Sequence, residues 1–232
     1  MRGEITWAGV ALSSLGNVLI EEAPETNRPA RKVDRYEVPG RNGDIVVPQN
    51  AWENVPREYA LAIYAGDYNE MASALMSWLY APVGYQRLQD SFDAYVYRLA
   101  YVSAETDIDN LKNTDGRCRI EFECDPRRFL LSGETAVTGG NVTNPTAFVA
   151  KPIITVRGSG SGTVSCGGKT LTISGIVDGM ILDCERMNAY EGTTNLNNLV
   201  SGGFPVIPGG AQEITFTGGV TSVEVVPNWW TI

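Results

Sequence analysis

Carboxylates are the only acid–base catalysts that this sequence offers, because its 232 residues include no histidine. Without histidine the chain cannot form a Ser-His-Asp triad, a Cys-His dyad or a histidine-ligated metal site. Two close pairs of acids, Asp90 with Asp93 and Asp107 with Asp109, could flank a glycosidic bond. Proximity in a loop sequence does not establish proximity in space, so we interpret them as solvated loop acids and predict no catalytic residue.

The four cysteines do not have the spacing of zinc ligands, so we predict no metal site and no cofactor. Cys118 and Cys124 lie six residues apart on one expected strand. That spacing is about 20 Å at the rise of a strand, which is too far for a disulfide. We expect buried free thiols, while a bridge between Cys166 and Cys184 stays open.

Two glycine-rich stretches contain parts of a phosphate-binding loop. Gly158-Ser-Gly-Ser-Gly162 lacks the Lys-Ser/Thr ending and no helix is expected after it, so we predict a mobile hairpin turn. Gly167-Gly-Lys-Thr170 has part of that ending but lies between two expected strands. Cys166–Lys169 and Thr217–Val220 have the glycine pairs that are typical of hairpin ends.

The aromatic residues near the end of the sequence are candidates for sugar binding. Trp229 and Trp230, with Tyr190 and Phe204, could stack on a sugar ring. Adjacent residues on a strand point to opposite faces, so we expect one tryptophan in the core and the other at the surface. This pair carries the alternative function, a carbohydrate-binding module that recognises a host cell-wall polymer.

The composition indicates an acidic globular protein, with 43% hydrophobic residues and a net charge of −9. An acidic chain repels phosphate backbones, so we expect no sequence-specific binding of nucleic acid. No run approaches the ~20 apolar residues of a membrane span. Residues 1–7 also lack an apolar signal core, so we expect a soluble protein made in the cytoplasm, with no membrane partner.

One helix is predicted, between Asp67 and Pro82. Asp67 and Glu70 resemble a capping box, and Pro82 with Gly84 ends the segment. A single apolar stripe favours packing of this helix against a sheet. The stripe consists of Tyr68, Met71, Ala72, Leu75, Trp78 and Leu79.

Alternating patterns predict strands on both sides of the helix. Arg57–Ala65 alternates, with Tyr59, Leu61 and Ile63 on one face. Tyr95–Val102 is apolar on both faces, which is typical of a central strand. In Arg117–Cys124 the inward residues are expected to be Cys118, Ile120, Phe122 and Cys124.

The composition changes near residues 133–146, and beyond them short strands alternate with turns and no helical period occurs. This pattern favours an antiparallel sandwich. We therefore predict a mainly β fold in two domains. Residues 1–139 form a β-sandwich-like domain with one α-helix, and residues 140–232 form a second β-sandwich.

The stretch Tyr36-Glu-Val-Pro-Gly-Arg-Asn-Gly-Asp44 lies between two strand-like runs. Proline restricts φ and removes a donor, while Gly and Asn tolerate positive φ, so the chain must turn here. Arg41 is therefore expected at the tip of a constrained loop.

Several short pieces, taken in order, resemble the distal tail protein (Dit) family of siphophages, the bacteriophages and prophages with long non-contractile tails. Their order covers nearly the whole chain. They are Val38-Pro-Gly-Arg-Asn-Gly-Asp44, Trp78-Leu79, Gly84-Tyr85 with Leu88 and Asp90, Ile120 to Pro126, Pro152-Ile-Ile154, Ile181-Leu-Asp-Cys-Glu185, Phe204-Pro205, Pro208-Gly209, and Val225 with Pro227 and Trp229.

The resemblance implies a structural virion protein and not an enzyme. Dit proteins form a homo-hexamer, a distal tail hub that joins the tail tube to the tail tip or baseplate and lets DNA pass. Their N-terminal domains close the ring, and a galectin-like, jelly-roll second domain projects outward. The implied partners are the tail tube protein, the tail-associated tail-tip protein, the tape-measure protein and a receptor-binding protein. The implied location is the virion tail tip, after assembly in the bacterial host cytoplasm.

A ring built from one chain needs a heterologous interface, in which two different surfaces meet. Exposed strand edges and protruding loops can supply such a contact by β-augmentation, so we expect it at the 36–44 turn and the Tyr95–Val102 strand. A glycosidase and a tail-tube subunit are further alternatives. The candidate ring or partner contacts are Tyr36, Pro39, Arg41, Asn42, Tyr95 and Tyr97.

Overall fold

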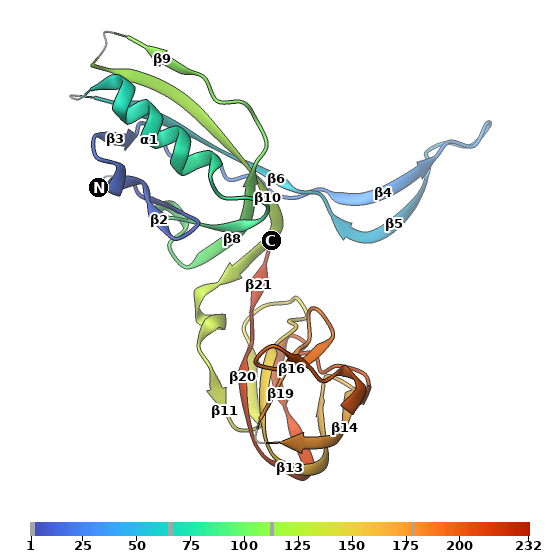
Figure 1. Ribbon diagram of the computed structural model, residues 1–232. Helices are drawn as coiled ribbons and strands as arrows, with labels where there is room; N and C mark the ends of the chain where they lie inside the picture. The colour runs from blue at the N-terminus through green and yellow to red at the C-terminus, as the bar shows by residue number, and fades with distance from the viewer. Residues whose placement is uncertain (1–2, 65–66, 112–113, 178) are drawn as a thin grey trace. The chain divides into compact units, whose positions relative to one another are not determined.

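The computed structural model describes residues 3–64, 67–111, 114–177 and 179–232 (Figure 1). The chain divides into two compact units, residues 1–128 with Ile232, and residues 129–231. Both units are built mainly from strands, so the predicted fold class is confirmed. Residues 129–139, which we expected in the first domain, lie in the second unit, because β11 (Val137–Thr138) pairs with β20 (Thr215–Val226).

The first unit contains a large antiparallel sheet with the strand order β2-β1-β7-β8-β10-β6-β3, and β9 pairs with β10. The apolar alternation of each strand places one face of the sheet in the core. The strands are β1 (Ile5–Trp7), β2 (Val10–Ala11), β3 (Val18–Ile20), β6 (Val55–Ile63), β7 (Gln86–Asp90), β8 (Val96–Val102), β9 (Ile108–Asn110) and β10 (Gly116–Leu130). Two short 3-10 helices, η1 (Leu12–Leu15) and η2 (Ser91–Asp93), complete the unit.

The alternation in β10 and β6 is confirmed. Cys118, Ile120 and Phe122 are buried on β10, while Arg119, between the first two, is exposed. On β6, Leu61 opposite Cys118 and Tyr59 opposite Ile120 are also buried, so the two strands present one continuous face to the core. This face, with the aromatic rings packed on it, forms the core of the first unit.

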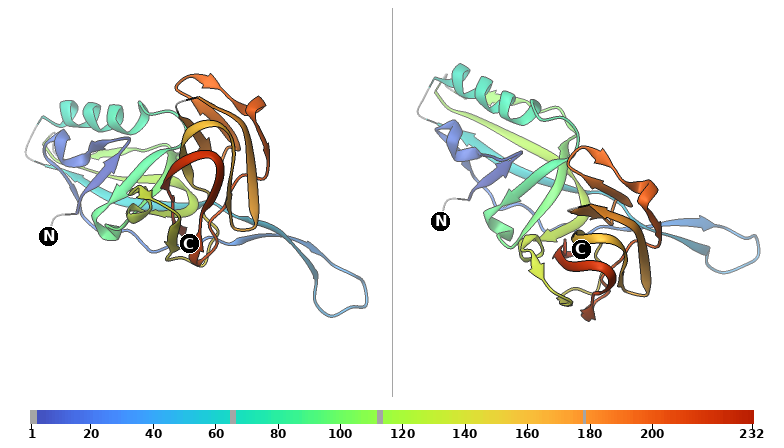
Figure 2. Two further views of the ribbon diagram at one scale, coloured as in Figure 1. Left: turned by 90° about the horizontal axis from the view of Figure 1, so that it is seen from below. Right: turned by 60° about the horizontal axis from the view of Figure 1, so that its bottom comes forward.

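The helix α1 (Tyr68–Tyr80) follows the predicted cap. The Asp67 carboxylate accepts the backbone N–H groups of Asn69 and Glu70 at 2.9 and 3.3 Å. Leu75 and Leu79 are fully buried in the core of the first unit, so the predicted packing of the helix on the sheet is confirmed. Both views in Figure 2 show the helix lying along this sheet.

Two strands of the first unit leave the large sheet and pair only with each other in the described chain. These strands, β4 (Arg31–Tyr36) and β5 (Ile45–Trp52), form a two-stranded antiparallel ribbon. Figures 1 and 2 show the ribbon extending away from the sheet of its own unit. The chain reverses at its tip, as the Pro-Gly and Asn-Gly pairs predicted.

The second unit contains a sheet in the order β11-β20-β13-β15-β16-β17, in which β14 pairs with β13 and β18. β12 and β19 form a separate two-stranded pair, and alternating aliphatic residues form the core of this unit. The remaining elements are η3 (Leu131–Glu134), β12 (Asn141–Asn144), β13 (Ile153–Cys166), β14 (Lys169–Val177), β15 (Met180–Asp183), β16 (Asn188–Glu191), β17 (Thr194–Asn195), η4 (Asn197–Leu199), β18 (Val200–Gly202), β19 (Gly210–Glu213) and β21 (Trp230–Thr231).

Two predicted turns of the second unit are wrong. Residues 158–162 lie inside β13, and residues 217–220 lie inside β20, where the register between the two strands shifts. The glycines permit an unusually close approach, since a Cβ on Gly219 would lie 1.8 Å from the Ser159 carbonyl oxygen. By contrast, the predicted hairpin end at Cys166–Lys169 is confirmed as the link between β13 and β14.

All four cysteines are free and buried, which is the predicted state. The alternative of a Cys166–Cys184 disulfide, left open by the sequence, is therefore not realised in the structure.

Candidate assembly interface

The ribbon exposes apolar side chains on both of its faces. Tyr36 lies opposite Ile45, and Val47 is two residues further along the same strand, so these three share a face. Val46 and Pro48 point to the other face. Tyr36 and Val46 are each 55% exposed, and Val47 is 45% exposed. An isolated two-stranded hairpin is at best marginally stable in water. The ribbon is thus an apolar element that this chain leaves uncovered.

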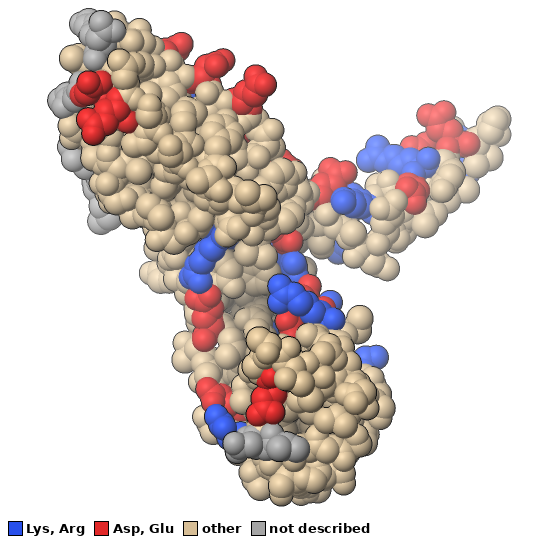
Figure 3. Space-filling view, in the orientation of Figure 1, with Lys and Arg blue, Asp and Glu red and all other residues tan. Residues whose placement is uncertain are grey.

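Charge does not distinguish the ribbon, since Figure 3 shows acidic and basic side chains mixed along it. Its distinguishing features are the apolar residues and the outer edges of its two strands, which pair with no other described strand. An unpaired edge next to apolar side chains is a template for another strand. The ribbon therefore has the properties of a surface that another chain covers.

Four of the sequence-predicted contact residues lie at this ribbon. Tyr36 ends β4, and Pro39, Arg41 and Asn42 lie in the exposed turn that follows. The Arg41 N–H donates to the Val38 carbonyl at 3.1 Å, which closes the turn. The structure thus brings these four residues together at one end of the first unit.

The other two predicted contact residues, Tyr95 and Tyr97, belong to the large sheet instead. Tyr95 is 84% exposed just before β8, and the guanidinium of Arg87 lies 4.1 Å from the ring centroid of Tyr97. The ring of Tyr85, just before β7, meets the ring of Tyr101 on β8 edge to face, with centroids 5.1 Å apart. The outer side of these two strands is therefore an aromatic surface.

One expectation about this surface is wrong. We expected β-augmentation at the Tyr95–Val102 strand, but β8 lies between β7 and β10, so both of its edges are already hydrogen-bonded. The strand is central, as its two-sided pattern predicted. It can offer its aromatic face to a partner but not an edge.

A buried ionic network was missed by the sequence analysis, which placed Asp90 in a solvated loop. Asp90 is only 4% exposed, and its Oδ2 accepts from Arg57 Nη2 at 2.8 Å and from Tyr59 Oη at 2.6 Å. Its Oδ1 accepts the backbone N–H groups of Phe92 and Asp93, so the carboxylate also caps η2. The sequence could have indicated this network, because Arg57 is two residues from Tyr59 on an alternating strand and so points to the same, inward face.

The second acid of that pair is also ion-paired. Asp93 Oδ2 accepts from Arg98 Nη2 at 2.9 Å and from Arg128 Nη2 at 2.6 Å. Burial opposes the charged form, but the two arginines outweigh it and lower the pKa of Asp93. Asp107 and Asp109 are exposed, as expected. Asp90 and Asp93 are therefore placed to hold the sheet together.

Two side chains that contact Asp90, Arg57 and Tyr59, have shifted pKa values. Burial disfavours the cationic form of Arg57, but Tyr59 and Asp90 outweigh it and raise the pKa of the guanidinium. Burial, together with the charge of Asp90, raises the pKa of the Tyr59 hydroxyl. Neither Arg57 nor Tyr59 therefore exchanges a proton near neutral pH.

The two tryptophans divide between core and surface, as predicted. Trp229 is 5% exposed and lies in the core of the second unit. Trp230 is partly exposed, but its ring stacks on Phe148 with centroids 4.4 Å apart. The Trp230 Nε1–H donates to the Val149 carbonyl at 3.0 Å. One face of the candidate sugar-stacking ring is therefore already covered by the protein.

Two negative findings concern the described residues only. Their His, Cys, Asp and Glu side chains form no group of three or more that could hold a metal ion. No helix in this part of the chain has the length and apolar character that crossing a bilayer requires.

Comparison with solved structures gives a full-length match. No protein-family model and no curated protein matches the sequence. The crystal structure of the SPP1 Dit protein (gp 19.1) matches with a TM-score of 0.76, at 11% sequence identity, over 100% of both chains. This chain has the Dit fold. The SPP1 protein is described as a paradigm of the hub adsorption apparatus in phages that infect Gram-positive bacteria.

The Dit fold accounts for both units, because the match covers the whole of each chain. At 11% identity the match shows the fold and not the activity. The resemblance to Dit proteins in the sequence is thereby confirmed at the level of the fold.

Proposed function

We propose that this protein is a structural subunit of a phage tail, the distal tail hub. The observation that carries the proposal is the Dit fold over the whole chain, shared with a hub protein of the adsorption apparatus. In this role the protein joins the tail tube to the tail tip or baseplate. Six copies form a ring, and DNA passes through its central hole. The protein sits at the virion tail tip after assembly in the host cytoplasm.

The ring closes through two different surfaces of each chain. One is the ribbon, whose tip carries Tyr36, Pro39, Arg41 and Asn42. The other is the aromatic face that includes Tyr97 on β8. Because the two surfaces differ, the contact is heterologous and generates a ring or a filament instead of a twofold dimer. The apolar side chains of the ribbon, left uncovered in one chain, become buried between neighbours.

The first unit builds the ring, and the second unit acts as a galectin-like domain on its outside. The partners above and below are the tail tube protein, the tail-associated tail-tip protein and the tape-measure protein. A receptor-binding protein attaches to the same hub. No step of this role needs catalysis.

Sedimentation of the full-length chain over a range of concentrations tests the proposal. We expect a species with the mass of six 25.1 kDa chains. A tail-tube subunit would instead form stacks of increasing mass. The proposal fails if the chain stays monomeric at every concentration, both alone and mixed with the tail tube protein of the same phage.

A further inference from the structure

The segment that leads from β3 into the ribbon runs antiparallel to β6 and the residues before it. At one end the Glu21 N–H donates to the Ala60 carbonyl at 2.8 Å. At the other end the Glu53 N–H donates to the Ala30 carbonyl at 2.9 Å. The ribbon is therefore the continuation of an antiparallel pairing that begins inside the large sheet.

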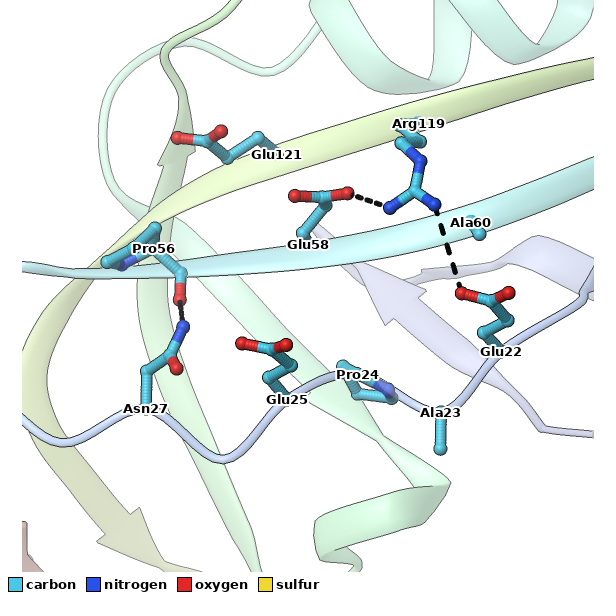
Figure 4. Close-up of a pocket in the computed structure, with 10 residues that line it drawn as sticks. All are labelled: Glu22, Ala23, Pro24, Glu25, Asn27, Pro56, Glu58, Ala60, Arg119 and Glu121. Carbon is cyan, nitrogen blue, oxygen red and sulfur yellow. Dashed lines mark hydrogen bonds and ion pairs between the residues drawn. The ribbon is translucent and has the colours of Figure 1, made fainter.

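Between those two bonds the backbone ladder is interrupted. No backbone–backbone hydrogen bond of the described chain joins residues 22–29 to residues 54–59. Three prolines explain part of this gap, because Pro24, Pro29 and Pro56 have no N–H to donate. An opening of about 320 Å³ lies where the two segments part, and residues of both segments line it (Figure 4).

Two side chains bridge the interrupted stretch in place of the backbone. Arg57 Nη1 donates to the carbonyl oxygen of Glu25 at 2.8 Å. Asn27 Nδ2 donates to the carbonyl oxygen of Pro56 at 3.1 Å, and Figure 4 shows this contact across the opening. One bridge comes from each segment, so the two segments are tied in both directions.

The Arg57 bridge is anchored in the core. Arg57 is only 6% exposed, and its Nε and Nη2 atoms donate to Asp90 Oδ2 at 3.2 and 2.8 Å. Tyr59 donates to the same carboxylate oxygen, and Asp90 belongs to β7 on the far side of β8 and β10 in the strand order. One guanidinium therefore connects the base of the ribbon to a strand in another part of the sheet.

We infer that residues 22–29, together with the two residues before β6, form the hinge of the ribbon, and that Arg57 and Asn27 are positioning residues that set its direction. From Val55 onward β6 is fixed by its pairing with β10. A segment with an interrupted ladder bends more easily than a paired one, and a few such residues suffice for a hinge. This inference rests on the proposed function, because the direction of the ribbon sets the angle between neighbouring chains. The two side chains thus set the geometry that allows a ring to close.

Spin labels on the full-length chain test the hinge under dilute, monomeric conditions. The labels are attached at Asn42→Cys, in the turn of the ribbon, and Ser73→Cys, on the exposed side of α1. All four natural cysteines are buried and do not compete for the label. The test variants are Asn27→Ala and Arg57→Lys. The lysine keeps a charge beside the aspartate but cannot span both acceptors. The matched control is Gln86→Ala, which removes one exposed side-chain-to-backbone hydrogen bond outside the hinge, from Gln86 Nε2 to the Val83 carbonyl.

We expect the label–label distance distribution to broaden in both test variants and to stay narrow in the control. Thermal unfolding of Asn27→Ala should match that of Gln86→Ala, since each loses one exposed side-chain-to-backbone hydrogen bond. If the ribbon keeps its direction only about a tenth of the time, the concentration needed for ring assembly rises roughly tenfold.

Unchanged distance distributions in Asn27→Ala would overturn the hinge, whatever happens to Arg57→Lys. A wild-type chain that forms no ring would refute the proposed function, while the distance measurement on the monomer would still decide the hinge.

Discussion

Charge placed on the ribbon should prevent ring assembly without unfolding the chain. Val47 shares a face with Tyr36 and Ile45, and Val46 lies on the opposite face. The perturbation is an aspartate at one position at a time, Val47→Asp or Val46→Asp. Both valines are about half exposed, so we expect the free energy of unfolding to change by no more than about 0.5 kcal/mol.

The expected magnitude follows from the exposure of the side chain. Burying a whole valine contributes about 1.5–3 kcal/mol. Since Val47 is 45% exposed, a neighbour that covers the remainder gains about 1 kcal/mol. An aspartate at this position does not contribute this free energy on association. Its unpaired charge must also be desolvated when the neighbour covers it, which costs several kcal/mol. A total of at least about 3 kcal/mol per contact corresponds to roughly hundredfold weaker association.

The assay is the concentration of half-assembly, measured by mass photometry or sedimentation. Val149→Asp is the matched control, because Val149 is 47% exposed but lies in the second unit. If both ribbon variants assemble like this control, the reasoning that the ribbon is buried between neighbours is refuted. If only one of them is impaired, the neighbour covers that face alone.

Three further predictions concern stability. Burial tends to raise the pKa of Asp93, but Arg98 and Arg128 outweigh it, so the pKa is lowered on folding. The Asp93 carboxylate therefore stabilises the fold above about pH 4, and this contribution is lost as the pH falls through the folded pKa. Urea denaturation should therefore show that Asp93→Asn is destabilised at pH 7 more than at pH 3; an equal loss at both would contradict this. Gly219→Ala should lower Tm by several degrees, because its Cβ would meet the Ser159 carbonyl oxygen at 1.8 Å, whereas Gly175→Ala, with nothing nearer than 4.0 Å, should not. Burial raises the thiol pKa to about 11 for Cys118 and to about 12 for Cys124 and Cys184. Ellman's reagent at pH 8 should therefore react with these thiols only after the chain unfolds. Rapid reaction of the native chain would contradict their burial.

The parts of the fold that the sequence predicted are those governed by local rules. The cap at Asp67, the stripe that buries Leu75 and Leu79, and the alternation through Phe122 each depend on residues within one element. Periodicity reports such features directly. The reversal near Arg41 was predictable for the same reason, since Pro and Gly act on their own backbone.

The parts that it missed depend on partners far away in the chain. The glycines at 158–162 indicate a turn when considered alone, and only the glycines at 217–220 on β20 reveal a paired bulge. Asp90 is indistinguishable from a loop acid until Arg57, 33 residues away, lies beside it. The sequence also did not predict that β4 and β5 leave the large sheet, because the alternation of a strand does not identify its neighbours.

Electron microscopy of the purified full-length chain, alone and with the tail tube protein, tests the central claim most directly. We expect closed particles with sixfold symmetry, a central channel, and a ribbon from each chain lying against its neighbour. Single chains, twofold dimers or open filaments in both preparations would contradict it.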